Sequence, residues 1–269
     1  MRPPKNVLEA FGVSSSPNPL PGGQGQNYRA GSIVLKPVTN AAEARWVAEV
    51  YRDLPPSNFR LPRPVSTSSG EWIIEGWSAQ EFVTGETAEG GHYEARFQAC
   101  RDFHRALESI PQPDFLAERQ DPWSQADRIV WEGEPWHPHP QLADIYQRLM
   151  DYTEPLELPQ QLIHGDIAGN MLYAPGQPLA IIDFSPYWRP AIYAEALLFV
   201  DAVMWEGAPW SILELMSPDD VTTQVILRAA MRRLAEVNQH YLTGKNPETY
   251  LSQSRHYWAF LNRMETYIL

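Results

Sequence analysis

The stretch QLIHGDIAGNMLYAPGQPLAIIDF, residues 161–184, decides the fold of this 269-residue chain. Two short apolar runs, MLY and LAII, flank the turn PGQP, and this pattern predicts a β-hairpin. Asp166 and Asn170 precede the first run, and Asp183 ends the second. Asp183 follows Asn170 by 13 positions, which suits a chain that runs out, turns and returns. We therefore expect these three polar side chains to lie together.

Two carboxylates and one amide form a set of hard oxygen ligands. Mg²⁺ is usually bound by one or two carboxylates together with the phosphates of a substrate. Phosphoryl transfer needs positioning, a metal that bridges the phosphates, and a group that receives the hydroxyl proton. The stretch is suited to this chemistry, with Asp166 as the proton acceptor and Asn170 and Asp183 as metal ligands.

Other interpretations of the same residues exist. Taken singly, Asp166 and Asn170 are typical of a capped turn, and Asp183 is typical of a cap on the next segment. A metal-dependent hydrolase built on His164, Asp166 and Asp183 is another interpretation. It leaves a glycine-rich loop and a strand lysine near the N-terminus without a role.

The first third of the chain predicts short strands and one helix. Residues 32–38, SIVLKPV, form a β-rich run that carries Lys36 near its end. Asn40 is a suitable N-cap for a helix over residues 41–54, which two prolines end. Two more strands are expected at 71–75 and 79–83.

The pattern becomes helical after Gly85, apart from the hairpin. Apolar residues at helical spacing predict a helix over 93–110, and shorter and final helices are expected over 142–150 and the last twenty residues. A cap at Ser217, Pro218 in the first turn and the acids after it predict a long helix towards Tyr241, which Gly244 closes. Residues 131–140, rich in Pro and Trp, predict a loop. We therefore expect an α+β chain with a small β-rich lobe, 1–83, and a mainly helical lobe, 84–269, that carries the catalytic hairpin 161–184.

The charge balance excludes one class of partner. With 21 Lys+Arg against 33 Asp+Glu, the net charge is −12, whereas nucleic-acid binders normally carry a basic patch. Residues 84–200 hold 18 acids and 7 bases, which indicates a solvated acidic surface that would favour a cationic acceptor. No apolar run has the length of a membrane span or signal peptide, and the single Cys100 fits a reducing compartment. We expect a cytoplasmic protein without nucleic-acid or membrane partners.

The motif HGDIAGN at 164–170, followed by Ile182-Asp183-Phe184, resembles the catalytic loop and metal-binding motif of the aminoglycoside phosphotransferase and choline kinase-like family. These proteins are relatives of protein kinases by fold, and the resemblance spans about residues 20–205. It implies a bilobal protein-kinase-like fold. The implied activity is the phosphorylation, dependent on Mg and on ATP or another nucleoside triphosphate, of a small-molecule hydroxyl. Aminoglycosides, amino sugars and choline-like metabolites are the implied acceptors.

The resemblance also assigns roles within the helical lobe. It implies that Asp166 is the catalytic base and that Asn170 and Asp183 bind magnesium. His164 would be a structural member of the loop. The Phe103-His104 pair resembles a pair on a long helix of the family, where the histidine serves packing and hydrogen bonding.

The nucleotide-binding residues that the resemblance implies are Gly22, Gly23, Gly25, Lys36, Glu43, Glu81 and Val83. Glycines allow backbone N–H groups to approach phosphate closely, although Tyr28 replaces the third glycine of the kinase pattern. Lys36 would contact the phosphates, and Glu43, which matches the pattern better than Glu49, would pair with it. Residues 81–83 fall at the expected hinge between the lobes, where backbone groups would bind adenine.

One stretch departs from the family pattern. Tyr187, Trp188 and Arg189 either form an aromatic wall and a cation for an anionic acceptor, or pack the segment after Asp183. The irregular glycine loop and this stretch leave a second function open, a nucleotide-binding regulator without turnover. The acceptor, the choice between ATP and GTP, and the oligomeric state are not determined by the sequence.

Overall fold

The computed structural model describes residues 2–21, 25–55, 57–242 and 251–268. The chain divides into two compact units. One comprises Met1–Thr87 with Asn170–Phe184, and the other comprises Ala88–Gly169 with Ser185–Leu269. The sequence placed the boundary at residues 83/84 and the whole stretch 161–184 in the helical lobe. Residues 170–184 instead belong to the first unit, because their strands pair there.

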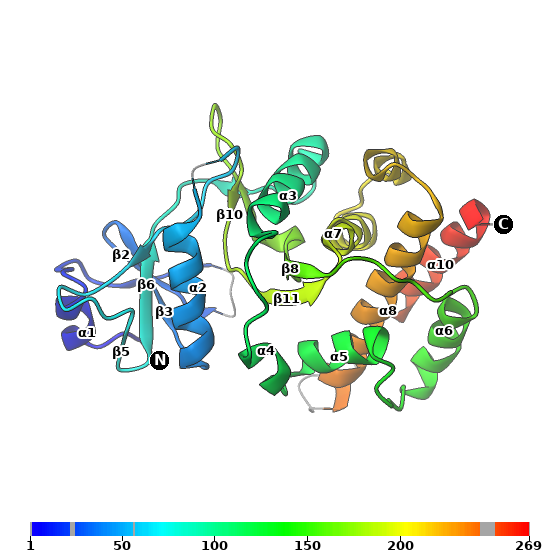
Figure 1. Cartoon of the computed structure of the whole chain (residues 1–269), viewed down its shortest axis with the longest axis horizontal. Coiled ribbons are helices and arrows are strands. Elements are labelled where there is room, and N and C mark those ends of the chain that lie inside the picture. The colour runs from blue at the N-terminus through cyan, green and yellow to red at the C-terminus, as the bar shows by residue number, and fades with distance from the viewer. Residues whose placement is uncertain (1, 22–24, 56, 243–250, 269) are drawn as a thin grey trace. The chain divides into compact units, whose positions relative to one another are not determined.

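The first unit is built on an antiparallel sheet (Figure 1). Its described strands follow the order β1 (Asn18–Pro19), β2 (Tyr28–Ala30), β3 (Ile33–Pro37), β6 (Trp77–Glu81) and β4 (Pro64–Val65), with β5 (Ile73–Ile74) also paired to β6. Lys36 on β3 lies opposite Ser78 on β6. One face of the sheet buries an apolar cluster that includes residues of α1 (Lys5–Ala10). The predicted strand around Lys36 is confirmed, and Pro37 is its last residue.

Helix α2 (Ala41–Asp53) follows β3 directly. The Asn40 side chain accepts hydrogen bonds from the backbone N–H groups of Ala42 and Glu43, which the ordinary geometry of the first turn leaves without helical partners. The predicted helix and its cap are confirmed.

A second, small sheet of the first unit contains the predicted hairpin. β9 (Met171–Tyr173) pairs antiparallel with β10 (Ala180–Ile181) and, on its other side, with β7 (Glu86–Thr87). Gly85, just before β7, has a φ of +152°, and a Cβ there would lie 2.9 Å from the Leu172 Cβ. Only glycine fits this approach between the two strands.

The second unit is mainly helical (Figure 1). Its described helices are α3 (Tyr93–Leu107), α4 (Phe115–Glu118), α5 (Pro122–Trp131), α6 (Pro140–Asp151), α7 (Ala191–Trp205), η3 (Trp210–Met216), α8 (Asp220–Leu242) and α10 (Ser254–Ile268). α7 is apolar and almost wholly buried, and packs against α3, α8 and α10. The strands β8 (Gln161–His164) and β11 (Pro186–Arg189) form an antiparallel pair. This frame positions the loop that follows β8.

Helix α5 was not predicted. Its signals are present in the sequence, because the Asp121 side chain accepts from the Ser124 N–H and Pro122 occupies the first turn. The expected loop over 131–140 is shorter at both ends, since Trp131 ends α5 and Pro140 begins α6. Within the described residues, no helix combines the length and apolarity that crossing a bilayer requires.

Candidate active site

The Asp166 loop begins where β8 ends, in the second unit. The Asp166 backbone N–H donates to Nδ1 of His164, at 3.1 Å. Gly165 donates to the Ser185 carbonyl at 2.9 Å, and a Cβ on Gly165 would lie 2.2 Å from Cδ2 of the Tyr187 ring. The Tyr187 ring therefore requires glycine at position 165. The two hydrogen bonds fix the backbone of Gly165 and Asp166.

His104 of α3 holds the same loop from within the core. Its Nε2 accepts from the His164 backbone N–H at 3.0 Å, so Nδ1 carries the proton and donates to the Cys100 carbonyl at 2.6 Å. Burial is the main cause that lowers the pKa of His104 from 6.5 to about 3, and the ring is therefore neutral at ordinary pH. The predicted role of His104 in packing and hydrogen bonding is confirmed.

Arg96 of α3 holds the loop beyond Asp166, and sequence reasoning missed it. Its fully buried guanidinium donates to the Ala168 carbonyl at 3.0 Å. It also forms a bidentate pair with Glu206, at 2.5 and 2.7 Å. The loop from His164 to Ala168 is thus fixed by two residues of one helix.

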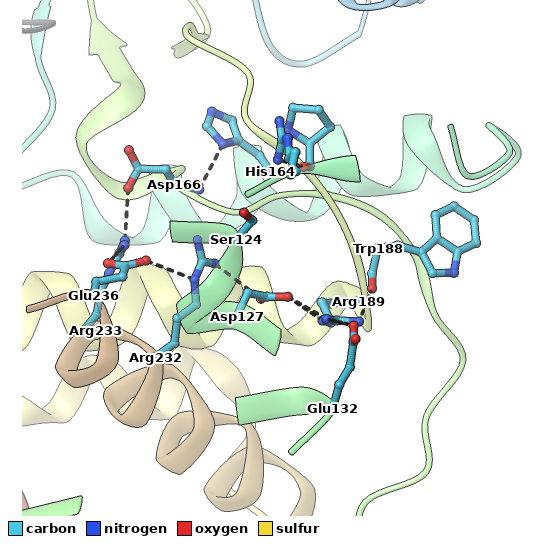
Figure 2. A network of polar contacts seen from close by, with 12 residues as sticks. Ser124, Asp127, Glu132, His164, Asp166, Trp188, Arg189, Arg232, Arg233 and Glu236 are labelled. Atoms are coloured by element: carbon cyan, nitrogen blue, oxygen red, sulfur yellow. Dashed lines mark hydrogen bonds and ion pairs between the residues drawn. The ribbon is translucent and has the colours of Figure 1, made fainter. Parts of the chain in front are cut away.

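The Asp166 carboxylate itself is paired with Arg233 of α8 (Figure 2). Nη2 of Arg233 donates to Oδ1 of Asp166 at 3.1 Å, while the aspartate side chain retains 55% of its exposure. Partial burial raises the pKa of the Asp166 carboxyl, but the guanidinium of Arg233, with smaller effects of His164 and Arg232, outweighs burial and lowers it below its ordinary value. Asp166 is therefore a carboxylate at neutral pH.

In the first unit, Lys36 and Asp183 form an ion pair at 2.6 Å. Both line a cavity of about 310 Å³ between β3, β6 and α2. Glu43 lines the same cavity, whereas Glu49 is exposed and is not part of its lining. The structure thus brings Lys36, Glu43 and Asp183 to one cavity, with Asp183 as the partner of the lysine. The pairing of Lys36 with Glu43 stays a prediction.

The segment that carries Asp183 is anchored by the next residue. The Phe184 ring stacks on Tyr51 of α2, with a centroid distance of 5.8 Å and an interplanar angle of 10°, and on Trp46, at 6.4 Å and 30°. Asp183 has a φ of +53°, in the left-handed region. This turn separates the buried ring from the carboxylate, which faces the cavity.

Asn170 lies at the start of the hairpin, as expected. It is the last residue of η2 (Ala168–Asn170), and its carbonyl accepts from the Ile182 N–H at 2.9 Å. Asn170 and Asp183 therefore come from neighbouring chain segments of the first unit. One amide and one carboxylate, with phosphates of a nucleotide completing the set, fit the ligands that Mg²⁺ takes in such sites.

The other predicted nucleotide-binding residues are partly described. Gly22 and Gly23 lie outside the described residues. Gly25 is exposed and has a φ of +67°, and no described heavy atom outside its chain neighbours lies within 4 Å of where its Cβ would be. At the expected hinge, Glu81 donates its N–H to the Arg63 carbonyl at 2.8 Å, and Val83 is half-buried. The N–H of Glu81 is therefore already used within the first unit.

The stretch after Phe184 packs rather than presenting a cation. Arg189 is buried and donates to Asp127 and Glu132, at 2.8 and 2.7 Å. The Tyr187 ring is buried, with the Arg232 guanidinium 4.3 Å from its centroid. For Tyr187 and Arg189 the structure supports the packing alternative, because the Tyr187 ring is buried and the Arg189 guanidinium already pairs with two carboxylates.

A profile of the family described as "Phosphotransferase enzyme family" matches residues 18–187. No curated protein sequence matches the chain significantly.

Solved structures show the same fold at low identity. A microcompartment-associated aminopropanol kinase superposes with a TM-score of 0.66 at 16% identity, over 97% of this chain and 96% of its own. An amicoumacin kinase in complex with AMP-PNP and Ca²⁺ gives 0.64 at 16%, over 93% and 88%. A spectinomycin phosphotransferase in complex with ADP and spectinomycin gives 0.60 at 14%, over 95% and 92%. The predicted α+β, protein-kinase-like fold class is confirmed.

Proposed function

Because the chain belongs to the phosphotransferase enzyme family, we propose that it transfers a phosphoryl group from ATP, or another nucleoside triphosphate, to a hydroxyl of a small molecule. The observation that carries the proposal is the Lys36–Asp183 ion pair in the cavity of the first unit. A lysine that can contact phosphates and a carboxylate that can bind Mg²⁺ are the two groups that binding of a magnesium–nucleotide complex requires.

The residues of the first unit would bind the nucleotide. The Lys36 ammonium would contact its phosphates, with Gly25 offering backbone N–H groups and Glu43 supporting the lysine. Asn170 and Asp183 would hold Mg²⁺, which neutralises charge on the phosphates when bound. Residues 81–83 would contact the base through the backbone.

Asp166 would act on the acceptor. Its ionised carboxylate accepts a hydrogen bond from the acceptor hydroxyl, orients the oxygen, and takes the proton as the phosphoryl group is transferred. The hydrogen bonds that join the loop backbone to His104 and Arg96 would keep Asp166 in position for this step.

The acceptor we favour is a hydroxylated amine, such as an amino alcohol, amino sugar or aminoglycoside. The neighbouring structures include an aminopropanol kinase and a kinase bound to spectinomycin. The 18 acids of residues 84–200 would attract a cation of this kind.

The test combines nucleotide binding with turnover. Wild-type protein is titrated with MgATP by calorimetry and then incubated with a panel of amino alcohols, amino sugars and aminoglycosides, with ADP release as the readout. We expect binding, turnover with at least one acceptor, and loss of turnover in Asp166→Ala. Binding without turnover on any acceptor would favour the regulator, and absence of binding would contradict both.

A matched pair of lysine variants tests the cavity. Lys36→Met should weaken MgATP binding by about tenfold or more, because the variant loses a charge-assisted contact to phosphate. Lys5→Met removes a lysine of the same unit that is 89% exposed, and it should bind MgATP like the wild type. Equal affinities of the two variants would exclude the assigned nucleotide site.

A further inference from the structure

Arg233 lies 67 residues from Asp166 in the sequence, yet it contacts the carboxylate on which the proposed reaction depends. It belongs to α8, outside the matched family region of 18–187. Its side chain is only 11% exposed, and its guanidinium reaches the more exposed carboxylate of Asp166 (Figure 2).

The hydrogen-bonding capacity of Arg233 is almost fully used by three carboxylates. Nε and Nη2 form a fork on Asp201 of α7, at 2.9 and 2.5 Å. Nη1 donates to Glu236 at 2.8 Å, and the other Nη2 hydrogen goes to Asp166 at 3.1 Å. These contacts use four of the five N–H donors of a guanidinium. Arg233 therefore has little capacity left to bind an acceptor anion, so any effect it has on the reaction would act through Asp166.

The guanidinium is also rigidly placed. Asp201 and Glu236 are both buried, and a bidentate arginine–carboxylate pair fixes the plane of both groups. α7 and α8 pack against each other, so the fork joins two elements of the core. The Oδ1 atom of Asp166, which this guanidinium contacts, is therefore held in a defined position.

We propose that Arg233 is a positioning residue of the phosphoryl-transfer site, which fixes the orientation of the Asp166 carboxylate by holding Oδ1. The proposal rests on the proposed function. Loss of the contact would remove the guanidinium that holds Oδ1, and the acceptor oxygen would meet a carboxylate whose orientation is less restricted.

The titratable and charged groups near the Asp166 carboxylate come from three elements, β8, α7 and α8. They are the titratable His164 of β8 and the charged Asp201 of α7 and Arg232, Arg233 and Glu236 of α8. Of these, Arg233 is the cation in contact with the carboxylate, and it contributes most to the lowered pKa of Asp166. Its removal should therefore raise that pKa and remove the contact at Oδ1 of Asp166.

Two variants and one control separate positioning from folding. Arg233→Lys keeps a charge but cannot form the fork. Arg233→Met combined with Asp201→Asn removes the cation together with its buried counter-charge, which protects the fold. Arg228→Lys is the control, since Arg228 is a buried arginine of the same helix that bonds Gln224 and the Glu154 carbonyl. Thermal unfolding confirms that each variant is folded.

The first readout needs no acceptor. The protein is labelled with ¹³C at aspartate carboxyls, and the Asp166 resonance is assigned by its absence in Asp166→Asn. We expect its titration midpoint to rise by about one unit or more in the double variant and less in Arg233→Lys. It should stay unchanged in Arg228→Lys.

The second readout is turnover with the acceptor found in the panel. We expect kcat to fall about tenfold in Arg233→Lys and about a hundredfold in the double variant, with the KM for ATP within twofold of wild type. A folded double variant with an unchanged midpoint, or with an unchanged kcat, would overturn the positioning role. A shifted midpoint in a protein that phosphorylates no acceptor would overturn the proposed function instead, and the role assigned to Arg233 with it.

Discussion

Replacing His104 by phenylalanine should make the stability of the protein respond differently to pH. The variant keeps an aromatic ring of similar shape but leaves the buried His164 N–H without its acceptor. An unsatisfied buried donor costs about 1–3 kcal/mol, so the variant should be less stable than wild type by about that amount at pH 7.

The wild-type advantage should shrink as the pH falls. His104 has a pKa of about 3 in the fold, against 6.5 ordinarily, so the unfolded chain binds its proton first. The neutral ring therefore contributes full stability above about pH 6.5, and this contribution is lost at about 1.4 kcal/mol per unit as the pH drops toward 3. The loss amounts to about 2 kcal/mol at pH 5. His104→Phe lacks this group and should show no such loss.

Urea unfolding at pH 7, 6 and 5 measures the difference. The gap between wild type and His104→Phe should close by about 2 kcal/mol from pH 7 to pH 5, leaving the two proteins of similar stability. His137→Phe, in an exposed loop, is the control and should show a constant difference from wild type. A gap for His104→Phe that is the same at all three pH values would refute the neutral, hydrogen-bonded histidine.

Three further predictions concern the segments that hold the site. Gly165→Ala places a methyl group against a buried ring, so it should cost about 1–3 kcal/mol in urea unfolding and reduce turnover, whereas Gly91→Ala, with open space around it, should do neither. Arg96→Met removes the cation that pairs with the Glu206 side chain, which is only 8% exposed, and should lower the free energy of unfolding by about 3–5 kcal/mol. Adding Glu206→Gln should recover part of this loss in a double-mutant cycle. Phe184→Ala should cost about 3–5 kcal/mol, and a loss below 1 kcal/mol would contradict the stacking seen here.

The parts of the fold that the sequence predicted are those with local physical causes. The Asn40 cap and the hairpin with its Pro-Gly turn need only neighbouring residues to form, and both are present. The expected closeness of Asn170 and Asp183 also follows from one short hairpin. Helix α5 has equally local signals at Asp121 and Pro122, although the prediction did not include it.

The residues that hold the Asp166 loop could not be found in the same way. Arg96 lies 72 residues before Ala168, and Arg233 lies 67 residues after Asp166. In a sequence, each resembles an ordinary charged residue on the solvated face of a helix. The burial of Asp201 and Glu236 is set by packing between helices, which no local pattern specifies. The one available signal was the apolar setting of Arg233 among Met231, Leu234 and Ala235.

The central claim is that Asp166 serves the transfer of a phosphoryl group to a small hydroxylated molecule. Its most direct test follows the label from [γ-³²P]ATP into the small-molecule fraction in the presence of Mg²⁺ and the acceptor panel. We predict labelled acceptor with the wild type, and labelled product reduced at least about a hundredfold with Asp166→Asn, whose MgATP affinity stays unchanged. Label in the acceptor at wild-type rates with Asp166→Asn would contradict the account.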